Sequence, residues 1–157
     1  MRFQKINQVE KIYITKSHKQ TQKLGGKFAR EILKMPLQKD AVVLGLQGNL
    51  GSGKTTFLQG LAKGFGINEK ILSPTFVILK RFEVPGFRFN DFYHIDCYRL
   101  KNEKDILELG FKKIIFDSRN IVAIEWPEKI KKVLPKNVIL IEFKFISKNK
   151  RKINFKM

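Results

Sequence analysis

Strand-like and helix-like patterns of apolar residues alternate along the first part of the chain. A weakly alternating stretch at 11–15 predicts a first strand. Ser17 and Gln20, three residues apart, form a capping-box signature, so a helix is expected to begin there and to end near Pro36. The apolar face of this helix holds Leu24, Phe28, Ile32 and Leu33.

A second strand and a second helix follow. Residues 41–46 form a continuous apolar run, which is typical of a parallel strand that is buried on both faces. Apolar residues then recur at helical spacing over 56–65, and Gly66 stands where a helix would stop. This order predicts an α/β fold that is built around a buried sheet.

An antiparallel hairpin and another helix are expected in the middle of the chain. Residues 75–82 and 87–96 are rich in β-forming residues and flank the turn Val84-Pro85-Gly86. The helical pattern that follows covers residues 100–111. The apolar residues expected to face inward from this helix are Ile106, Leu107 and Leu109.

The last part of the chain predicts a buried strand, a short helix and a closing hairpin. The strand covers 121–124 and runs into Glu-Trp-Pro, and the helix covers 128–134. The closing hairpin pairs residues 138–146 with residues 152–155. We find no repeat or linker, so we expect one domain over 1–157, with residues 1–10 as an N-terminal extension.

The link between the second strand and its helix has the sequence of a phosphate-binding loop. Residues 48–55 read GNLGSGKT and match the pattern G-x-x-x-x-G-K-[ST] without a mismatch. The glycines allow a tight turn that aims backbone N–H groups into one concave nest, which the positive end of the helix dipole also faces. Lys54 would reach the β- and γ-phosphates of a nucleotide, and the Thr55 hydroxyl would hold Mg²⁺. The residues expected to bind the nucleotide phosphates are Gly48, Gly51, Ser52, Gly53, Lys54, Thr55 and Thr56.

Composition limits the class of protein. The chain has 157 residues, of which 43% are hydrophobic, enough for a substantial core. A single cysteine, Cys97, excludes an internal disulfide framework and suits a reducing compartment. The chain has no membrane-length apolar run, and residues 1–11 lack the apolar core of a signal peptide. We therefore expect a cytoplasmic protein without a membrane partner.

The net charge of +18 arises from 25 lysines and 7 arginines against 14 acidic residues. Such a surface attracts polyanions, and phosphate contacts would make their binding sensitive to salt. A lysine-rich composition shared by every protein of the cell would give the same charge. The sequence leaves these two interpretations open.

Acidic residues stand at the ends of two predicted strands. Asp96 ends the second strand of the middle hairpin, and Glu125 follows 121–124. If both strands run parallel to 41–46, these carboxylates and the phosphate loop converge on one rim of the sheet. Strand alternation places His94 on the same side as Asp96, where it could help to position water, although pairing with a nearby carboxylate is the commoner role.

The order of four motifs resembles the TsaE (YjeE) family. The motifs are the phosphate loop, Ser73-Pro74-Thr75, His94-Ile95-Asp96-Cys97-Tyr98-Arg99 and Glu125-Trp126-Pro127, and the resemblance covers residues 12–155. It implies a P-loop NTPase-type three-layer fold with a central mixed, mainly parallel sheet and antiparallel hairpins. It also implies weak ATP hydrolysis that serves the formation of threonylcarbamoyladenosine in tRNA.

The resemblance also implies roles for individual residues and for partners. ATP or ADP would bind with Mg²⁺, held by Thr55, by Glu125 and by the acidic partner Asp96, while Thr75 would act as the switch residue that senses the γ-phosphate. His18 and Arg151 would hold the base, although Lys150 replaces the glycine that precedes this arginine in the family. Trp126 would guard the site or, equally, pack in the core. The partners would be TsaD-type and TsaB-type subunits, with tRNA bound only indirectly or weakly.

Three other functions are open to a protein with a phosphate loop. A small-molecule kinase would carry paired arginines, whereas the arginines after the loop, at positions 81, 88, 99, 119 and 151, are never closely paired. A GTPase would carry Asn-Lys-x-Asp, whereas residues 102–105 read NEKD. A nucleic-acid-binding module with a vestigial loop would bind nucleic acid without any nucleotide.

Overall fold

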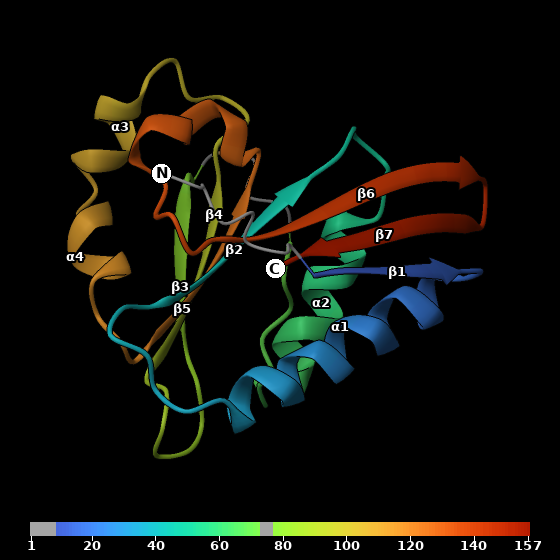
Figure 1. The fold of residues 1–157 in the computed structure, drawn as a ribbon, viewed down its shortest axis with the longest axis horizontal. Coiled ribbons are helices and arrows are strands. Elements are labelled where there is room, and N and C mark those ends of the chain that lie inside the picture. The colour runs from blue at the N-terminus through green and yellow to red at the C-terminus, as the bar shows by residue number, and fades with distance from the viewer. Residues whose placement is uncertain (1–8, 73–76) are drawn as a thin grey trace, which may run out of the picture.

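Seven strands form one mixed sheet in the computed structural model, which describes residues 9–72 and 77–157 (Figure 1). The order across the sheet is β1-β7-β6-β2-β5-β4-β3. The strands are β1 (Glu10–Thr15), β2 (Val42–Gln47), β3 (Leu79–Glu83), β4 (Asp91–Asp96), β5 (Asn120–Glu125), β6 (Ile139–Ser147) and β7 (Lys150–Lys156). The helices are α1 (His18–Lys34), α2 (Lys54–Gly64), α3 (Glu103–Leu107), α4 (Phe111–Ile115) and the 3₁₀ segment η1 (Pro127–Val133).

The four central strands are parallel and the outer strands are antiparallel. Strand β2 pairs in parallel with β5 and β6, and β5 pairs in parallel with β4. On one side β6, β7 and β1 pair antiparallel, and on the other side β3 returns antiparallel to β4. The expected mixed sheet with flanking hairpins is therefore confirmed.

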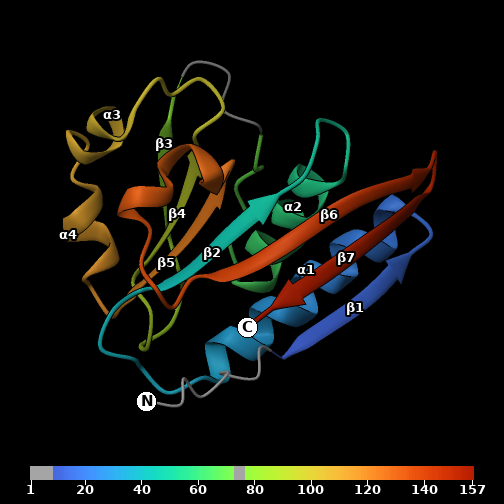
Figure 2. The same ribbon diagram turned by 45° about the horizontal axis from the view of Figure 1, so that its top comes forward.

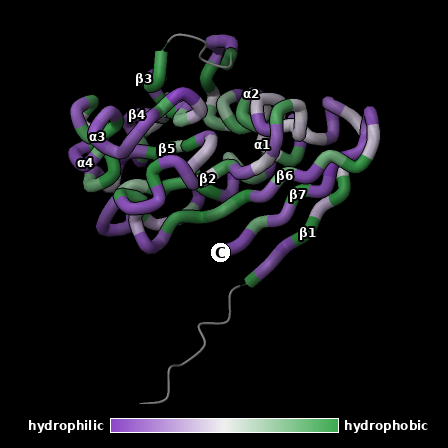
Figure 3. Tube along the Cα trace, turned by 90° about the horizontal axis from the view of Figure 1, so that it is seen from above, coloured by the Kyte–Doolittle hydropathy of each residue, from purple (hydrophilic) through white to green (hydrophobic). Residues whose placement is uncertain are grey.

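Helices cover both faces of the central sheet and form two separate cores. Alternation along β2 sends Val42, Leu44 and Leu46 into a core shared with α1 and α2, and Val43 into a second core with α3, α4 and η1. Figure 3 shows α1 and α2 on the same side of β6, β7 and β1. The three-layer arrangement is thus confirmed, and it leaves the carboxyl ends of the parallel strands free to form a site.

Helix α1 begins where its capping signature predicts. The Ser17 hydroxyl accepts a hydrogen bond from the backbone N–H of Gln20, and the Gln20 side chain accepts one from the backbone N–H of Lys16. Figure 2 shows α1 running beside β7 and β1, and the rings of Phe28 and Phe155 lie 4.9 Å apart in that layer. The cap and this packing fix the first turn of α1 near the phosphate loop.

Helices α1 and α2 cross with their backbones in direct contact. A Cβ atom added at Gly25 would lie 2.3 Å from the carbonyl oxygen of Phe57, and one added at Gly60 would lie 1.9 Å from that of Gln22. Only glycine permits such a close approach of two helix backbones. The contact locks α1 onto the helix that begins at Lys54.

The middle of the chain differs in part from its predicted structure. Residues 100–111 were expected to form one helix, but this prediction is wrong because Gly110, at φ 82°, separates α3 from α4. Ile106 is fully buried as predicted, whereas Leu109 lies just beyond α3 and is 48% exposed. The β3–β4 hairpin is confirmed with shorter strands, and Thr75 lies outside the described residues.

The end of the chain follows its prediction closely. Strands β6 and β7 form the closing hairpin, and the predicted helix at 128–134 is the 3₁₀ segment η1, one residue earlier. Cys97, directly after β4, is fully buried in the second core, on the side of the sheet opposite α1 and α2. Among the described residues, no helix is both long and apolar enough to cross a membrane.

Candidate functional site

A cavity of about 540 Å³ opens at the carboxyl ends of the parallel strands. It is bounded by the phosphate loop, the first turn of α1, the ends of β4 and β5, and the β6–β7 turn. The predicted site residues that line it are His18, Gly51, Ser52, Gly53, Lys54, Thr55, Thr56, Asp96, Glu125, Trp126 and Arg151. Segments far apart in the sequence thus meet at one rim.

The phosphate loop turns back on itself through left-handed glycines. Gly51 and Gly53 have φ values of 76° and 104°, which residues with a side chain rarely adopt. Ser52 between them is 2% exposed, and its Oγ atom has no hydrogen-bond partner among the described residues. A buried hydroxyl without a partner in the wall of a cavity is a donor that suits a ligand oxygen.

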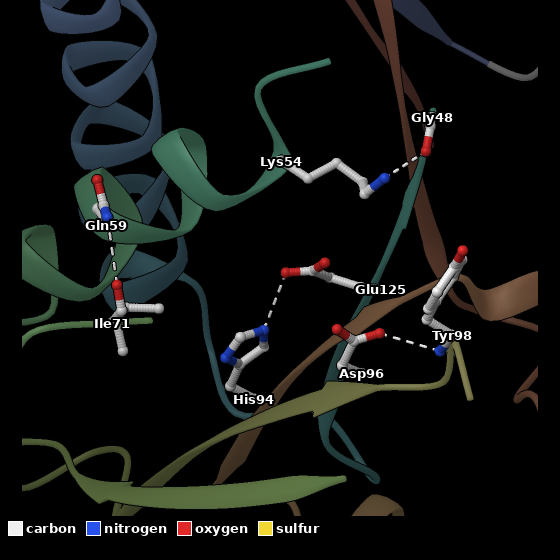
Figure 4. Close-up of polar contacts among 8 residues, drawn as sticks. All are labelled: Gly48, Lys54, Gln59, Ile71, His94, Asp96, Tyr98 and Glu125. Atoms are coloured by element: carbon white, nitrogen blue, oxygen red, sulfur yellow. Dashed lines mark hydrogen bonds and ion pairs between the residues drawn. The ribbon is translucent and has the colours of Figure 1, made fainter. Parts of the chain in front are cut away.

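Lys54 begins α2 and points back over the loop (Figure 4). Its Nζ donates hydrogen bonds to the carbonyl oxygens of Gly48 and Asn49 and lies 4.4 Å from the ring centroid of Trp126. Burial lowers the pKa of Lys54, and the negative charges of Glu125, Glu128 and Asp96 partly oppose that shift. Gly48 was also expected at the site, but it does not line the cavity, and its carbonyl oxygen accepts a hydrogen bond from Lys54.

The strand register places the two predicted carboxylates side by side. Residues Asp96 of β4 and Glu125 of β5 are direct partners across the parallel pair, and Glu125 is also the partner of Leu46 in β2. Both carboxylates therefore stand beside the start of the phosphate loop. The predicted convergence of strands, loop and carboxylates on one rim is confirmed.

Each carboxylate is held by a nearby donor. His94 Nε2–H donates to Glu125 Oε1 over 3.0 Å, and both side chains are buried (Figure 4). The backbone N–H of Tyr98 donates to Asp96 Oδ1 over 3.0 Å. Burial raises the pKa of Asp96 and the negative charge of Glu125 adds to the rise, whereas the Tyr98 hydrogen bond, His94 and Lys54 lower it.

Trp126 has the only positive φ among the described residues other than glycine, 58°. A bulky residue in this conformation is strained, and such strain is typical of functional sites. The backbone N–H of Trp126 donates to the carbonyl oxygen of Leu46, and its ring packs 5.2 Å from that of Tyr98. This geometry turns the indole toward Lys54 at the mouth of the cavity.

The two residues expected to hold the nucleotide base come from opposite ends of the chain. His18 lies in the first turn of α1, and Arg151 lies at the start of β7, where its stem is near Gly53. The Arg151 guanidinium lies 4.6 Å from the ring of Phe145 and donates to three backbone carbonyls of the turn, those of Ser147, Lys148 and Lys150. These contacts hold Arg151 at the cavity although Lys150 stands in place of glycine.

Sequence reasoning assigned no role to several residues that line the cavity. Thr21 lies one turn into α1 and its hydroxyl is paired with that of Thr15, while Asn149 lies at the tip of the β6–β7 turn. Tyr98 and Arg99 belong to the motif at 94–99, so the sequence did carry a signal that they lie near the site. For Thr21 and Asn149 no local pattern existed, because only the packing of α1 against the hairpin brings them there.

Comparisons with known proteins agree with this geometry. The family model described as "Threonylcarbamoyl adenosine biosynthesis protein TsaE" matches residues 15–153. Two proteins named "tRNA threonylcarbamoyladenosine biosynthesis protein TsaE" are similar. The one from Rickettsia typhi is 38% identical over 89% of this chain and 90% of its own length, and the one from Haemophilus influenzae is 33% identical over 78% and 75%. The crystal structure of Bacillus subtilis YdiB superimposes with a TM-score of 0.68 at 27% identity, and the match covers 95% of this chain and 86% of YdiB.

Proposed function

This chain belongs to the TsaE family of threonylcarbamoyladenosine biosynthesis proteins, and on that premise we propose that it is an ATPase required to form threonylcarbamoyladenosine in tRNA. It binds ATP or ADP together with Mg²⁺ in the cavity at the phosphate loop. Hydrolysis is weak in the isolated protein and is stimulated by protein partners, so ATP serves to reset or activate a complex. The chemistry on the tRNA is done by other proteins.

The observation that carries the proposal is the convergence of the phosphate loop, Lys54, Asp96 and Glu125 on one cavity. Backbone N–H groups of the loop and the amino end of α2 favour an anion in this place. The unpartnered Ser52 hydroxyl is a further donor that suits a phosphate oxygen. The donor set therefore fits a nucleotide polyphosphate.

The role proposed for each residue follows from its position. Lys54 neutralises charge on the β- and γ-phosphates, because its ammonium group lies at the loop and can turn from the loop carbonyls to a ligand. Thr55, Glu125 and Asp96 would hold Mg²⁺, which when bound would offset the negative charge of the phosphates. Asp96 is the acidic partner that orients the attacking water.

The outer residues of the site bind the rest of the nucleotide. His18 and Arg151 line the cavity and are proposed to hold the base, and Trp126 is proposed to close the mouth. Thr75, which lies outside the described residues, is proposed to sense the γ-phosphate. The proposed protein partners are subunits of the TsaD and TsaB types.

Calorimetric titration with ATP in the presence of Mg²⁺ tests the proposal. Lys54→Ala should lose most of its ATP affinity and all hydrolysis, because the charge at the phosphates is removed. Lys63→Ala is the matched control, since Lys63 lies exposed on the same helix and away from the cavity. A folded Lys54→Ala protein with unchanged ATP affinity would exclude the phosphate loop from function.

A further inference from the structure

Five cationic side chains form a line along the outer face of α1. They are Lys19, Lys23, Lys27, Arg30 and Lys34, all exposed, and we refer to them as the α1 stripe. Their spacing of three or four residues places them on one side of the helix. At 1.5 Å per residue the stripe is about 22 Å long.

The electrostatics of the helix itself do not favour this arrangement. Neighbours of like charge at a spacing of four residues repel each other, and a cation in the first turn opposes the helix dipole. The first turn of α1 contains no acidic residue, and Glu31 is the single acidic residue of the helix. Only Lys34, in the last turn, complements the helix dipole. The stripe as a whole therefore adds little to the stability of α1, which is held by its packing on α2 and the sheet.

Charge is also unevenly distributed over the molecule. Residues 9–34, which include β1 and α1, hold seven basic and two acidic residues, and residues 139–157 hold six basic and one acidic. Residues 99–119, which include α3 and α4, hold six basic and four acidic residues. Figure 1 shows α3 on the opposite side of the molecule from α1, so a polyanion is attracted more strongly to the α1 side than to the α3 side.

We propose that the α1 stripe binds the phosphate backbone of RNA. A line of five cations matches a ligand whose charges repeat along its length, as phosphates do. Four of the five cations are lysines, which bind phosphate as point charges and do not read bases as arginine forks do. Binding is therefore independent of sequence and falls steeply as salt concentration rises.

The stripe leads directly to the candidate nucleotide site. His18 and Thr21, on the first turns of α1, line the cavity, and so do Asn149 and Arg151 of the β6–β7 hairpin. The exposed lysines 148 and 150 stand beside them in the chain and extend the basic surface at that end. RNA bound along the stripe would therefore reach the cavity at the phosphate loop. The proposal does not depend on ATP hydrolysis.

The test is fluorescence anisotropy with a labelled tRNA transcript at several salt concentrations. The stripe variant carries Lys19→Gln, Lys23→Gln and Lys27→Gln, and the control variant carries Lys104→Gln, Lys112→Gln and Lys113→Gln on the α3–α4 side. All six lysines are exposed, and both variants lose the same net charge. Glutamine keeps a helix propensity close to that of lysine, and circular dichroism and a thermal melt verify folding.

The stripe variant should bind tRNA about tenfold more weakly at low salt, and its slope of log K against log salt should fall by about 2 to 3. The control variant should change affinity by less than about twofold. Equal losses in both variants would show that only net charge matters and would overturn the proposal. Unchanged tRNA binding by the stripe variant would also overturn it. Poly-glutamate is titrated in the same assay: if the stripe variant lost its binding to poly-glutamate but kept its binding to tRNA, the ligand would be an acidic protein. Because ATP is absent throughout, the result is independent of the calorimetric test of Lys54.

Discussion

The Nε2 atom of His94 lies 3.0 Å from Oε1 of Glu125, and both side chains are at most 4% exposed. The two residues stand on neighbouring parallel strands, 31 positions apart in the chain. A hydrogen bond of this kind fixes the orientation of a buried carboxylate. If the donor is removed, the carboxylate oxygen remains buried without a hydrogen-bond partner, which costs free energy. His94 therefore positions the carboxylate that we propose as a ligand of Mg²⁺.

Replacing His94 tests this positioning role. His94→Ala should lower the maximal rate of ATP hydrolysis about tenfold or more, because Glu125 loses its donor, while the affinity for ADP stays nearly unchanged. His94→Gln should recover part of the rate, since its amide can donate. Steady-state kinetics of both variants give kcat and KM separately. Wild-type kcat in both variants would show that the contact is only structural.

The two carboxylates at the rim should be needed for hydrolysis more than for binding. Glu125→Ala and Asp96→Ala should each lose Mg²⁺-dependent ATP hydrolysis and keep much of their ADP affinity, because the loop backbone still binds the phosphates. Phosphate release with the partner proteins present, beside calorimetry with ADP, measures the two effects. Either carboxylate would be excluded from the site by a normal hydrolysis rate in its variant.

The contact between α1 and α2 predicts opposite behaviour for two adjacent glycines. Gly25→Ala should destabilise the fold by about 2 kcal/mol or more, since its Cβ would lie 2.3 Å from the Phe57 carbonyl oxygen. Gly26→Ala should be neutral or stabilising by up to about 1 kcal/mol, because the added Cβ makes only ordinary contacts and alanine favours a helix. Urea unfolding of both variants measures the difference. Equal free energies of unfolding for the two variants would show that α1 and α2 can move apart at Gly25 without loss of stability.

Cys97 should be inert in the native protein. Burial, together with the charges of Asp96, Glu128 and Glu125, raises the pKa of its thiol to about 12. The reactive thiolate is therefore scarce at pH 8, and the thiol is shielded from solvent. Mass spectrometry after treatment with iodoacetamide should find no adduct on native protein and one adduct in urea. Rapid alkylation of the native protein would contradict the buried position.

The sequence by itself determined the local features of the site. The run GNLGSGKT between an apolar strand and a helix identifies a phosphate loop, because glycines, a lysine and a threonine at fixed spacing carry the whole motif. The Ser17 cap, the turn at 84–86 and the alternation of His94 with Asp96 are equally local. Each depends on residues within a few positions of one another, so the pattern is complete in the chain.

Only the tertiary structure decided which of these features meet. Alternation shows that His94 and Asp96 share a face, but the pairing of His94 with Glu125 depends on the parallel register of β4 and β5. The placement of Thr21 at the cavity depends on the close crossing of α1 and α2, and the break at Gly110 depends on how α3 and α4 cover the sheet. Strand register and helix crossing arise from packing between segments that are distant in the chain. A local pattern specifies the face that a side chain occupies and not the partner that packing brings to that face.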